Sequence, residues 1–258
     1  MRRSEDVARI REALRAAAEV VRPFTPGAVE FQEKADRAGP VTEADRAVDE
    51  VLHRLLPMEG EGWLSEETAD TPDRLGFRRV WVVDPLDGTR EFVEGVPEWC
   101  ISIGLVDDGV PVAGGILNPA TGEEVVGSLE TGVTLNGEPA GLSGRERLEG
   151  ALILGSRSEW KRGEWDRFEE APFHVKPCGS VAYKLAQVAV GLADGTWTLV
   201  PKQEWDVAAG AALVMASGGE VLHADGSRPR FNRPNPTLPN LLAAGGALLS
   251  EFRTRWLP

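Results

Sequence analysis

Apolar residues recur every three or four positions in two segments near the N-terminus, residues 4–21 and 42–56. That spacing places them on one face of a helix, so both segments are predicted to be amphipathic helices. Ser4 stands just before the first apolar position and is predicted to cap the first helix. The apolar positions are Val7, Ile10, Leu14 and Val21 in the first segment and Val48, Val51, Leu52, Leu55 and Leu56 in the second.

Short apolar runs separated by turn residues follow the second helix. Residues 79–83, Arg-Val-Trp-Val-Val, are rich in β-branched side chains and predict a buried strand, with Leu64 on a shorter strand upstream. Four further runs are divided by Asp-Asp-Gly, Asn-Pro and similar turn signals, which predicts an antiparallel meander. These runs are residues 100–106, 110–117, 123–128 and 132–135.

The pattern changes after a polar segment at residues 143–149, where predicted strands begin to alternate with predicted helices. Such alternation is typical of an α/β architecture. We therefore expect an α/β (α+β) protein of two closely packed subdomains, residues 1–148 and 149–258. In the second half, strands are predicted at 151–154, 196–200 and 241–244, and helices at 180–192 and 207–217.

Composition adds the first functional constraint. The 258 residues are 42% hydrophobic and 27% charged, as in ordinary globular proteins. The 28 basic side chains against 41 acidic ones give a formal net charge of −13. So acidic a chain argues against nonspecific binding to nucleic acid and against docking on anionic membranes, because both depend on basic side chains. An anionic substrate would need bound cations to attract it.

The cysteines and the N-terminal segment exclude further classes. Cys100 and Cys178 form no Cys-x-x-Cys pair, which excludes a thiolate zinc site. The N-terminal segment stays charged and lacks the apolar core of a signal peptide, and no stretch is long and apolar enough to span a bilayer. We therefore expect a cytoplasmic protein with two structural thiols.

The sharpest candidate for chemistry is residues 84–89, Asp-Pro-Leu-Asp-Gly-Thr, directly after the buried strand. Strand ends are where open α/β sheets place their sites. Asp84 and Asp87 could share a hard cation, Gly88 permits close approach of the backbone to a ligand, and Thr89 stands where a helix could begin. The structural alternative is a plain Asp-Gly turn.

Other acidic positions, taken by themselves, are better explained by structural roles. Glu66 and Glu67 fit the start of a short helix capped by Ser65. Asp206 precedes a run of small residues at 207–212 and fits the N-cap of a helix that packs closely against a neighbour.

Thr42 and Asp45 have the spacing of a capping box, with Asp in place of the usual Glu or Gln. That structural interpretation is sufficient by itself. A functional one requires the carboxylate of Asp45 to reach the hydroxyl of Thr89.

Three of these features occur in order: the glutamate pair beginning at Glu66, the Asp-Pro-Leu-Asp-Gly-Thr segment at 84–89, and Trp-Asp-x-Ala-Ala-Gly at 205–210. In this order and spacing they resemble the inositol monophosphatase superfamily, a group of magnesium-dependent, lithium-sensitive phosphatases. The resemblance covers nearly the whole chain, from residue 41 to residue 219 and beyond. It implies a layered αβαβα sandwich of the inositol monophosphatase and fructose-1,6-bisphosphatase type, and an enzyme that hydrolyses a small phosphorylated metabolite.

The resemblance also implies two Mg²⁺ ions and leaves room for a third near Glu66. Their ligands would all be oxygen atoms, which suits Mg²⁺ and disfavours zinc or copper. Two ions about 4 Å apart can clamp the attacking and leaving oxygens of an in-line displacement, and they would let an acidic protein bind an anion. The implied ligands are Glu66, Asp84 and the Leu86 carbonyl for one ion, and Asp84, Asp87 and Asp206 for the other.

Catalytic and substrate-binding roles are implied in the same way. Thr89, polarised by Asp45 with Thr42 beside it, and Glu66 would activate the attacking water. Backbone N–H groups of Gly88 and Thr89 would bind the substrate phosphate. The residues implied to contact substrate are Gly88, Thr89, Gly179, Ser180 and Asp206.

Two segments discriminate between branches of the superfamily: residues 88–92, Gly-Thr-Arg-Glu-Phe, and residues 199–206, Leu-Val-Pro-Lys-Gln-Glu-Trp-Asp. Inositol monophosphatases typically have Gly-Thr-Thr-Asn-Phe in the first and a glutamate at the position of Leu199. Both segments, and Ser-Arg-Ser at 156–158, are more similar to bacterial 3'(2'),5'-bisphosphate nucleotidases. We therefore expect 3'-phosphoadenosine 5'-phosphate as substrate, with inositol 1-phosphate or a sugar phosphate of the fructose-1,6-bisphosphatase kind as alternatives.

A function of another class stays open, because some bacterial relatives act by binding other proteins. A non-catalytic accessory factor of RNA polymerase or ribosome assembly is that alternative, although the full set of metal ligands argues against a purely non-enzymatic role. The resemblance also allows either a homodimer, usual for inositol monophosphatases, or a monomer, common among the nucleotidases.

Overall fold

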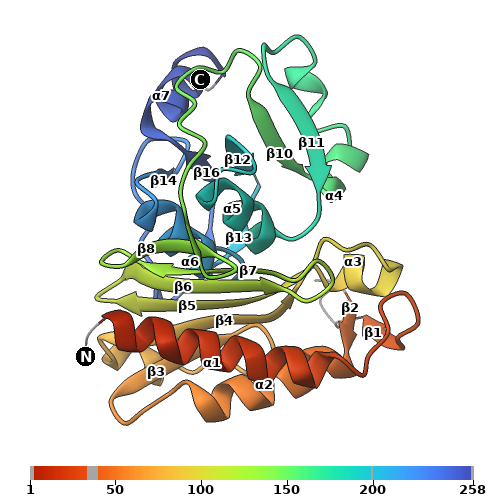
Figure 1. Ribbon diagram of the computed structural model, residues 1–258, viewed down its shortest axis with the longest axis vertical. Coiled ribbons are helices and arrows are strands. Elements are labelled where there is room, and N and C mark those ends of the chain that lie inside the picture. The colour runs from red at the N-terminus through yellow and green to blue at the C-terminus, as the bar shows by residue number, and fades with distance from the viewer. Residues whose placement is uncertain (1–2, 34–39, 199, 257–258) are drawn as a thin grey trace.

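The computed structural model describes residues 3–33, 40–198 and 200–256 and arranges them in alternating layers of helix and sheet (Figure 1). From one side to the other the order is helix, sheet, helix, sheet, helix, which is the expected αβαβα arrangement. None of the described helices is long and apolar enough to cross a membrane.

The larger sheet has seven strands in chain order, β3-β4-β5-β6-β7-β8-β9. Only β3 and β4 are parallel, and every other neighbouring pair is antiparallel. This confirms the predicted meander, which continues into an additional strand, β9. The strands are β3 (Glu61–Ser65), β4 (Arg79–Asp87), β5 (Cys100–Asp107), β6 (Val110–Asn118), β7 (Glu123–Ser128), β8 (Gly132–Leu135) and β9 (Glu138–Ala140).

The smaller sheet has five strands in the order β11-β10-β12-β16-β14. Strand β10 pairs in parallel with β11 and β12, whereas β16 pairs antiparallel with β12 and β14. Two further pairs, β1 (Phe31–Glu33) with β2 (Pro40–Thr42) and β13 (Lys202–Gln203) with β15 (Thr237–Leu238), lie outside both sheets. The five strands are β10 (Leu152–Ser156), β11 (His174–Cys178), β12 (Gly195–Thr198), β14 (Glu220–Leu222) and β16 (Leu241–Ala244).

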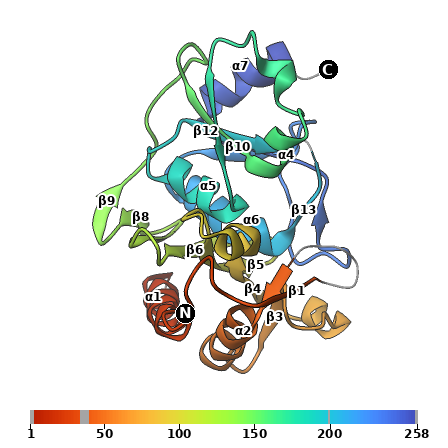
Figure 2. The same cartoon turned by 90° about the vertical axis from the view of Figure 1, so that its right-hand side faces the viewer.

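Helices cover both faces of the larger sheet. Helices α1 (Arg3–Val21) and α2 (Glu43–Leu55) lie on its outer face, and α5 (Val181–Ala189) and α6 (Glu204–Ala216) fill the layer between the two sheets (Figures 1 and 2). Helix α7 (Gly246–Trp256) covers the far side of the smaller sheet. Shorter helical segments are α3 (Thr89–Glu94), α4 (Arg157–Lys161), η1 (Pro72–Gly76) and η2 (Asp166–Phe168).

The core under α5 and α6 is continuous between the two halves of the chain. One cluster of buried apolar side chains joins Val82 of the larger sheet to Leu154 of the smaller sheet through α5 and α6. Residues 1–148 and 149–258 therefore share a core, and their description as two subdomains stays a prediction.

Several element boundaries differ from the predictions. Ser4 lies inside α1 (Arg3–Val21), so it is not the helix cap, and the neighbouring Arg3 pairs with Asp6 and Asp107. The strand predicted at 79–83 continues to Asp87. The sequence patterns do not predict β9, β11, α4 or α7.

The other differences lie in the second half. The helix predicted at 180–192 is α5, which Ser180 caps by accepting the backbone N–H of Tyr183. It ends at Ala189, shortly before Gly191 takes a positive φ. Strand β10 begins one residue later than predicted and extends to Ser156, whereas β12 ends at Thr198; Leu199 lies outside the described residues.

Candidate active site

Three carboxylates from two distant parts of the chain converge at the end of the larger sheet. Asp84 and Asp87 lie in the C-terminal part of β4, and Asp206 lies in the first turn of α6. One carboxylate oxygen from each lies within 4.8 Å of the others. The structure thus brings together three of the predicted metal ligands, although their role as ligands stays a prediction.

An irregularity in β4 explains how Asp84 and Asp87 reach the same place. Residues three positions apart in a regular strand point to opposite faces. Here Asp84 pairs with Ser102 but Asp87 pairs with Cys100, so the ladder shifts register between them. A bulge of this kind re-aims a side chain and brings both carboxylates to one face, next to α6.

Burial and mutual repulsion dominate the electrostatics of this cluster. Loss of water raises the pKa of Asp84 well above its usual range, and the nearby charges of Glu66, Asp87 and Asp206 raise it further. Burial, together with Asp87 and Glu66, raises the pKa of Asp206 to about 8. Carboxylates in this arrangement favour either bound protons or a bound cation. Because all the donors are oxygens of hard ligands, the residues present fit Mg²⁺.

The two remaining predicted metal ligands stand beside this cluster. Glu66 follows β3 and lines the same pocket as the three aspartates. It lies in an irregular segment rather than in the short helix that Ser65 was expected to cap; the Ser65 hydroxyl instead donates to Asp49 at 2.5 Å. The Leu86 carbonyl oxygen lies 3.0 Å from the Thr89 hydroxyl oxygen, as an alternative acceptor to Asp45, and the Leu86 N–H donates to Asp84.

Asp206 is the third residue of α6 and not its N-cap, contrary to the prediction. Gln203 occupies the cap, and the Asp206 carboxylate accepts the Gln203 backbone N–H at 3.0 Å as the reciprocal half of a capping box. The first turn of α6 therefore fixes one oxygen of Asp206. The helix positions this carboxylate as firmly as a cap would.

Thr42, Asp45 and Thr89 form a connected set of hydrogen bonds. Thr42 donates through both its backbone N–H (2.8 Å) and its hydroxyl (2.6 Å) to Asp45 Oδ2. The Thr89 hydroxyl donates to Asp45 Oδ1 at 3.0 Å. Burial raises the pKa of Asp45 despite these bonds. The capping box and the contact with Thr89 thus coexist, so the structural interpretation of Asp45 does not exclude the functional one.

Gly88 makes the turn that carries the chain from β4 into α3. Its φ is +92°, and an added Cβ would meet the Glu98 carbonyl oxygen at 2.9 Å, so only glycine fits without a shift of the backbone. The turn places Thr89 at the start of α3, in the wall of the pocket.

The pocket above the carboxylates has a volume of about 320 Å³. Beyond the predicted residues, its wall contains Arg90, Glu91, Ser158 and Arg162. The Arg90 guanidinium lies 3.5 Å from the Ser158 hydroxyl, which joins α3 to α4 across the mouth. No pattern in the sequence singles out Arg162, because α4 is too short to leave a periodic signal.

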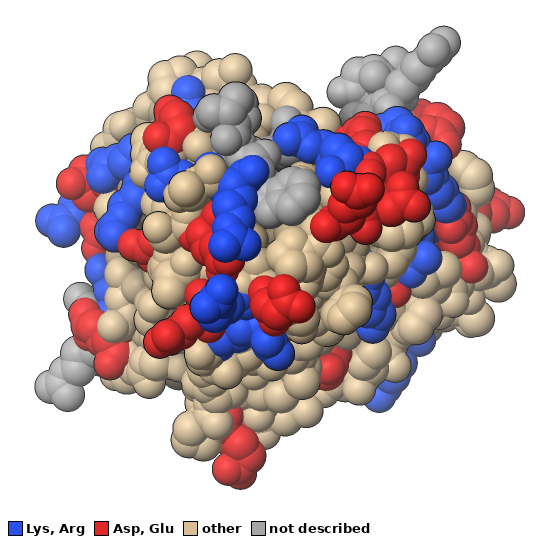
Figure 3. Space-filling model, turned by 90° about the horizontal axis from the view of Figure 1, so that it is seen from above, with Lys and Arg blue, Asp and Glu red and all other residues tan. Residues whose placement is uncertain are grey.

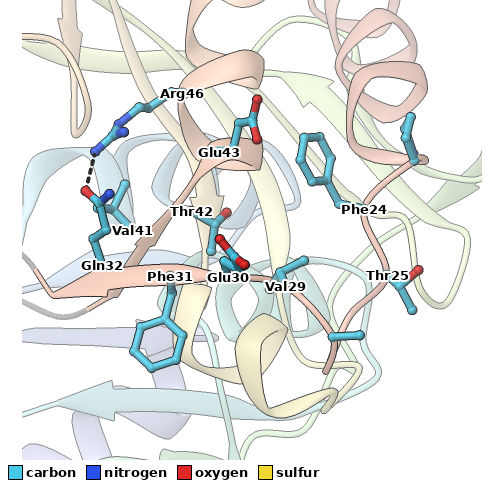
Figure 4. A pocket seen from close by; sticks show the side chains of 12 residues that line it. Phe24, Thr25, Val29, Glu30, Phe31, Gln32, Val41, Thr42, Glu43 and Arg46 are labelled. Carbon is cyan, nitrogen blue, oxygen red and sulfur yellow. Dashed lines mark hydrogen bonds between the residues drawn. The ribbon is translucent and has the colours of Figure 1, made fainter.

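A larger hollow, of about 760 Å³, lies among residues 23–32, β2 and the first turn of α2 (Figure 4). Phe24, Val29, Glu43 and Arg46 contribute to its lining, but none of the three clustered aspartates does. The chemistry therefore places the site at the smaller pocket.

Gly179 and Ser180 each donate a hydrogen bond to an acidic side chain. The Ser180 hydroxyl donates to Asp87 Oδ2 at 2.7 Å, and the Gly179 N–H donates to Glu98 at 2.7 Å. Neither residue is part of the wall of the 320 Å³ pocket, so their expected contact with substrate stays a prediction. The second specificity position, Leu199, lies outside the described residues.

Comparisons with known proteins agree with this geometry. A family model described as the inositol monophosphatase family matches residues 3–256. The chain is 33% identical over 231 residues to inositol monophosphatase 3 of Solanum lycopersicum, covering 84% of this chain and 85% of the relative. It is 35% identical over 205 residues to the Nus factor SuhB of Pseudomonas aeruginosa, covering 72% and 73%.

Solved structures give the same result. The IMPase of Thermotoga maritima matches with a TM-score of 0.83 and 26% identity, over 98% of this chain and 96% of that one. CysQ of Bacteroides thetaiotaomicron, a bacterial member of the inositol monophosphatase family, matches with a TM-score of 0.77 and 29% identity, over 93% and 97%. The chain therefore belongs to the inositol monophosphatase family of metal-dependent phosphatases, which hydrolyse phosphoric monoesters.

Proposed function

We propose that this protein is a Mg²⁺-dependent phosphomonoesterase that uses two ions to activate water. The observation that carries the proposal is the convergence of Asp84, Asp87 and Asp206 within 4.8 Å beneath a pocket walled by Gly88 and Thr89. Buried carboxylates so close together repel one another unless cations lie between them. This arrangement suits a phosphate ester, whose negative charge the cations would offset.

Glu66, Asp84 and the Leu86 carbonyl would hold one ion, and Asp84, Asp87 and Asp206 the other. When bound, Mg²⁺ lowers the pKa of a coordinated water and stabilises the charge on the transferring phosphoryl group. Asp84 would serve as a ligand to both ions, and its side chain is more buried than that of Asp87.

The protein's own proton path would run through Thr89 and Asp45. Because the Thr89 hydroxyl donates to Asp45 Oδ1, its lone pairs are available to accept a hydrogen from the attacking water. Burial raises the pKa of Asp45, and a carboxylate with a raised pKa is a stronger base. Gly88 and Thr89 would hold the phosphate through backbone N–H groups while this transfer occurs.

For the substrate, we infer a phosphate ester that carries a second anionic group, with 3'-phosphoadenosine 5'-phosphate as the leading candidate. Arg90 and Arg162 line the same pocket as the carboxylates, and the Arg162 guanidinium also pairs with Glu164. A second phosphate would match them better than the hydroxyl groups of an inositol ring, because guanidinium pairs most strongly with anionic oxygens. The alternatives are inositol 1-phosphate and fructose 1,6-bisphosphate.

The test is phosphate release from these three esters side by side, with Mg²⁺, with EDTA, and with Mg²⁺ plus Li⁺. The proposal predicts release that needs Mg²⁺, falls with Li⁺, and is fastest for the nucleotide. Arg90→Ala should raise KM for the nucleotide about tenfold, the worth of one charged hydrogen bond. The matched control is Arg54→Ala, which removes an exposed arginine of α2 outside the pocket. Fastest release from inositol 1-phosphate would keep the mechanism and overturn the inference about the second anion.

A second candidate, a protein-binding role, is supported by the 35% identity to the Nus factor SuhB of Pseudomonas aeruginosa. It predicts that Asp84→Asn, which disrupts the metal cluster, still captures a stoichiometric protein partner. If the variant loses every partner that the wild-type protein binds, this role depends on the metal site and is not separate from catalysis.

A further inference from the structure

Lys184 of α5 is a buried cation close to the carboxylate cluster, outside the wall of the pocket. Its side chain is turned toward the backbone that precedes α5. The ammonium group donates to the Ser180 carbonyl at 2.9 Å and lies 3.4 Å and 3.5 Å from the carbonyls of Cys178 and Gly179. Three successive carbonyl groups therefore converge on one ammonium group, and these contacts offset part of the cost of burying its charge.

The turn held in this way has an unusual backbone. Ser180 has a φ of +47°, a conformation that serine adopts rarely and that the surroundings must therefore impose. The carbonyls of the turn accept from Lys184, whereas the hydrogen-bond donors of the turn bind acidic side chains instead. The Gly179 N–H reaches Glu98, which also receives the Arg157 guanidinium.

The donor groups of the same turn fix Asp87. The Ser180 hydroxyl at 2.7 Å and the Ala182 N–H at 2.6 Å both donate to Asp87 Oδ2. One carboxylate oxygen is thus committed to the protein, and Oδ1 is the oxygen left to face a cation. The same turn therefore contacts Asp87 on one side and Lys184 on the other.

We propose that Lys184 is a positioning residue that sets the Mg²⁺ affinity of the site by holding the backbone turn at residues 178–180 and, through Ser180, the orientation of Asp87. This inference rests on the proposed function, because it takes Asp87 to be a metal ligand. The charge of Lys184 acts in the same sense, since it lowers the pKa of Asp87 against the larger effect of burial.

The test measures Mg²⁺ binding directly, by calorimetry on the EDTA-treated full-length protein, together with kcat at saturating Mg²⁺. Groups that orient a metal ligand typically change metal affinity by about 10–100-fold when removed. Lys184→Met should therefore raise the Kd for Mg²⁺ by at least about tenfold and leave kcat at saturating Mg²⁺ close to the wild-type value. Lys176→Met is the matched control, because it removes the same charge from an exposed position on neighbouring β11.

Two more variants separate positioning from a general loss of packing. Lys184→Gln keeps a donor for the carbonyls and should bind Mg²⁺ with a Kd between those of the wild-type protein and Lys184→Met. Ser180→Ala removes the hydroxyl on Asp87, so the double variant Lys184→Met/Ser180→Ala should bind Mg²⁺ no more weakly than the weaker single variant. Additive losses of affinity, or an unchanged Kd in folded Lys184→Met, would overturn the inference. If Lys184→Met does not fold, an unchanged Kd in both Lys184→Gln and Ser180→Ala would overturn it.

Asp87→Asn distinguishes this failure from failure of the proposed function. If Asp87→Asn binds Mg²⁺ as the wild-type protein does, the proposed metal site is wrong. If Asp87→Asn loses Mg²⁺ while the Lys184 and Ser180 variants keep it, only the role of Lys184 is wrong.

Discussion

At the scale of single residues, Asp84 and Asp206 are carboxyl groups whose burial affects the stability of the metal-free protein. Burial raises the pKa of both, that of Asp206 to about 8 and that of Asp84 well above its ordinary range. A folded state with raised carboxyl pKa values binds more protons than the unfolded chain between about pH 4 and the folded pKa. The free energy of unfolding of the metal-free protein should therefore fall as the pH rises through this window.

This predicts that the Tm in EDTA falls from pH 5 to pH 8, and that the rise in Tm on adding Mg²⁺ is larger at pH 8 than at pH 6. Asp206→Asn should flatten the fall, because it removes one of the titrating groups. Thermal melting followed by circular dichroism checks all three points. If the Tm of the metal-free protein rises between pH 5 and pH 8, these carboxylates do not dominate the pH dependence of its stability.

Thr89 allows a second test at this scale. Its hydroxyl oxygen lies 3.0 Å from both Asp45 Oδ1 and the Leu86 carbonyl oxygen, and its single hydrogen can be donated to one of them at a time. Thr89→Ala should reduce kcat by about 10²–10⁴-fold, the usual worth of a group that moves a proton, whereas Thr89→Ser should stay near the wild-type rate. Steady-state kinetics at saturating Mg²⁺ separates the two, and equal losses in both variants would remove the hydroxyl from the mechanism.

At the scale of helices and strands, the local sequence pattern of each element determines which site residues can be found from sequence. The segment after β4 was identifiable because a buried apolar strand leads directly into Asp84 and Asp87. The capping pattern of Thr42 and Asp45 was also visible, but a pattern cannot show that its carboxylate meets Thr89. Neither the register shift in β4 nor the turn at residues 178–180 leaves a periodic pattern in the sequence. The sequence alone therefore does not reveal which groups hold Asp87 in place.

Helix α6 delivers Asp206, and its small residues let it approach the larger sheet closely. An added Cβ at Gly114 of β6 would meet the Ala209 carbonyl oxygen at 2.4 Å, so the helix would have to move. Gly114→Ala should lower the free energy of unfolding by about 1–3 kcal/mol, as overpacking does, and weaken Mg²⁺ binding by displacing Asp206. Urea denaturation checks the first effect. The control is Gly141→Ala, whose Cβ would meet nothing within 4 Å and which should change neither property.

At the scale of the whole molecule, the sequence patterns predict the helices and strands, whereas the expected order of the layers came from the family resemblance. The amphipathic helices at the N-terminus and the antiparallel meander are confirmed, because each has a clear period. β11 and α7 were not predicted; β11 is a short edge strand that contains Pro177, and proline within a run disfavours a strand prediction. Which helix faces which sheet is decided by packing between residues far apart in the chain.

The shared core yields a prediction about the two halves. Val82 and Leu154 belong to one apolar cluster, and α5 and α6 cover the inner face of the larger sheet. A fragment of residues 1–148 would expose that face, so it should not melt cooperatively when expressed alone. Mixing it with residues 149–258 should restore a cooperative transition by calorimetry. A fragment 1–148 that melts cooperatively by itself would instead support two independent subdomains.

The distribution of charge agrees with a phosphatase that relies on cations. On the face above the smaller sheet, acidic and basic side chains are interspersed, without a continuous basic stripe of the kind that binds nucleic acid (Figure 3). With a net charge of −13, the protein as a whole repels an anionic ester, and we propose that cations bound at the carboxylate cluster offset this repulsion.

The central claim is that Asp84, Asp87 and Asp206 hold the metal on which phosphate release depends. The most direct measurement is anomalous diffraction from crystals of the protein soaked with Mn²⁺ as a substitute for Mg²⁺. We predict anomalous peaks at hard-cation distance, about 2.0–2.6 Å, from oxygens of all three aspartates. Peaks elsewhere, with none at this cluster in a protein that releases phosphate, would contradict it.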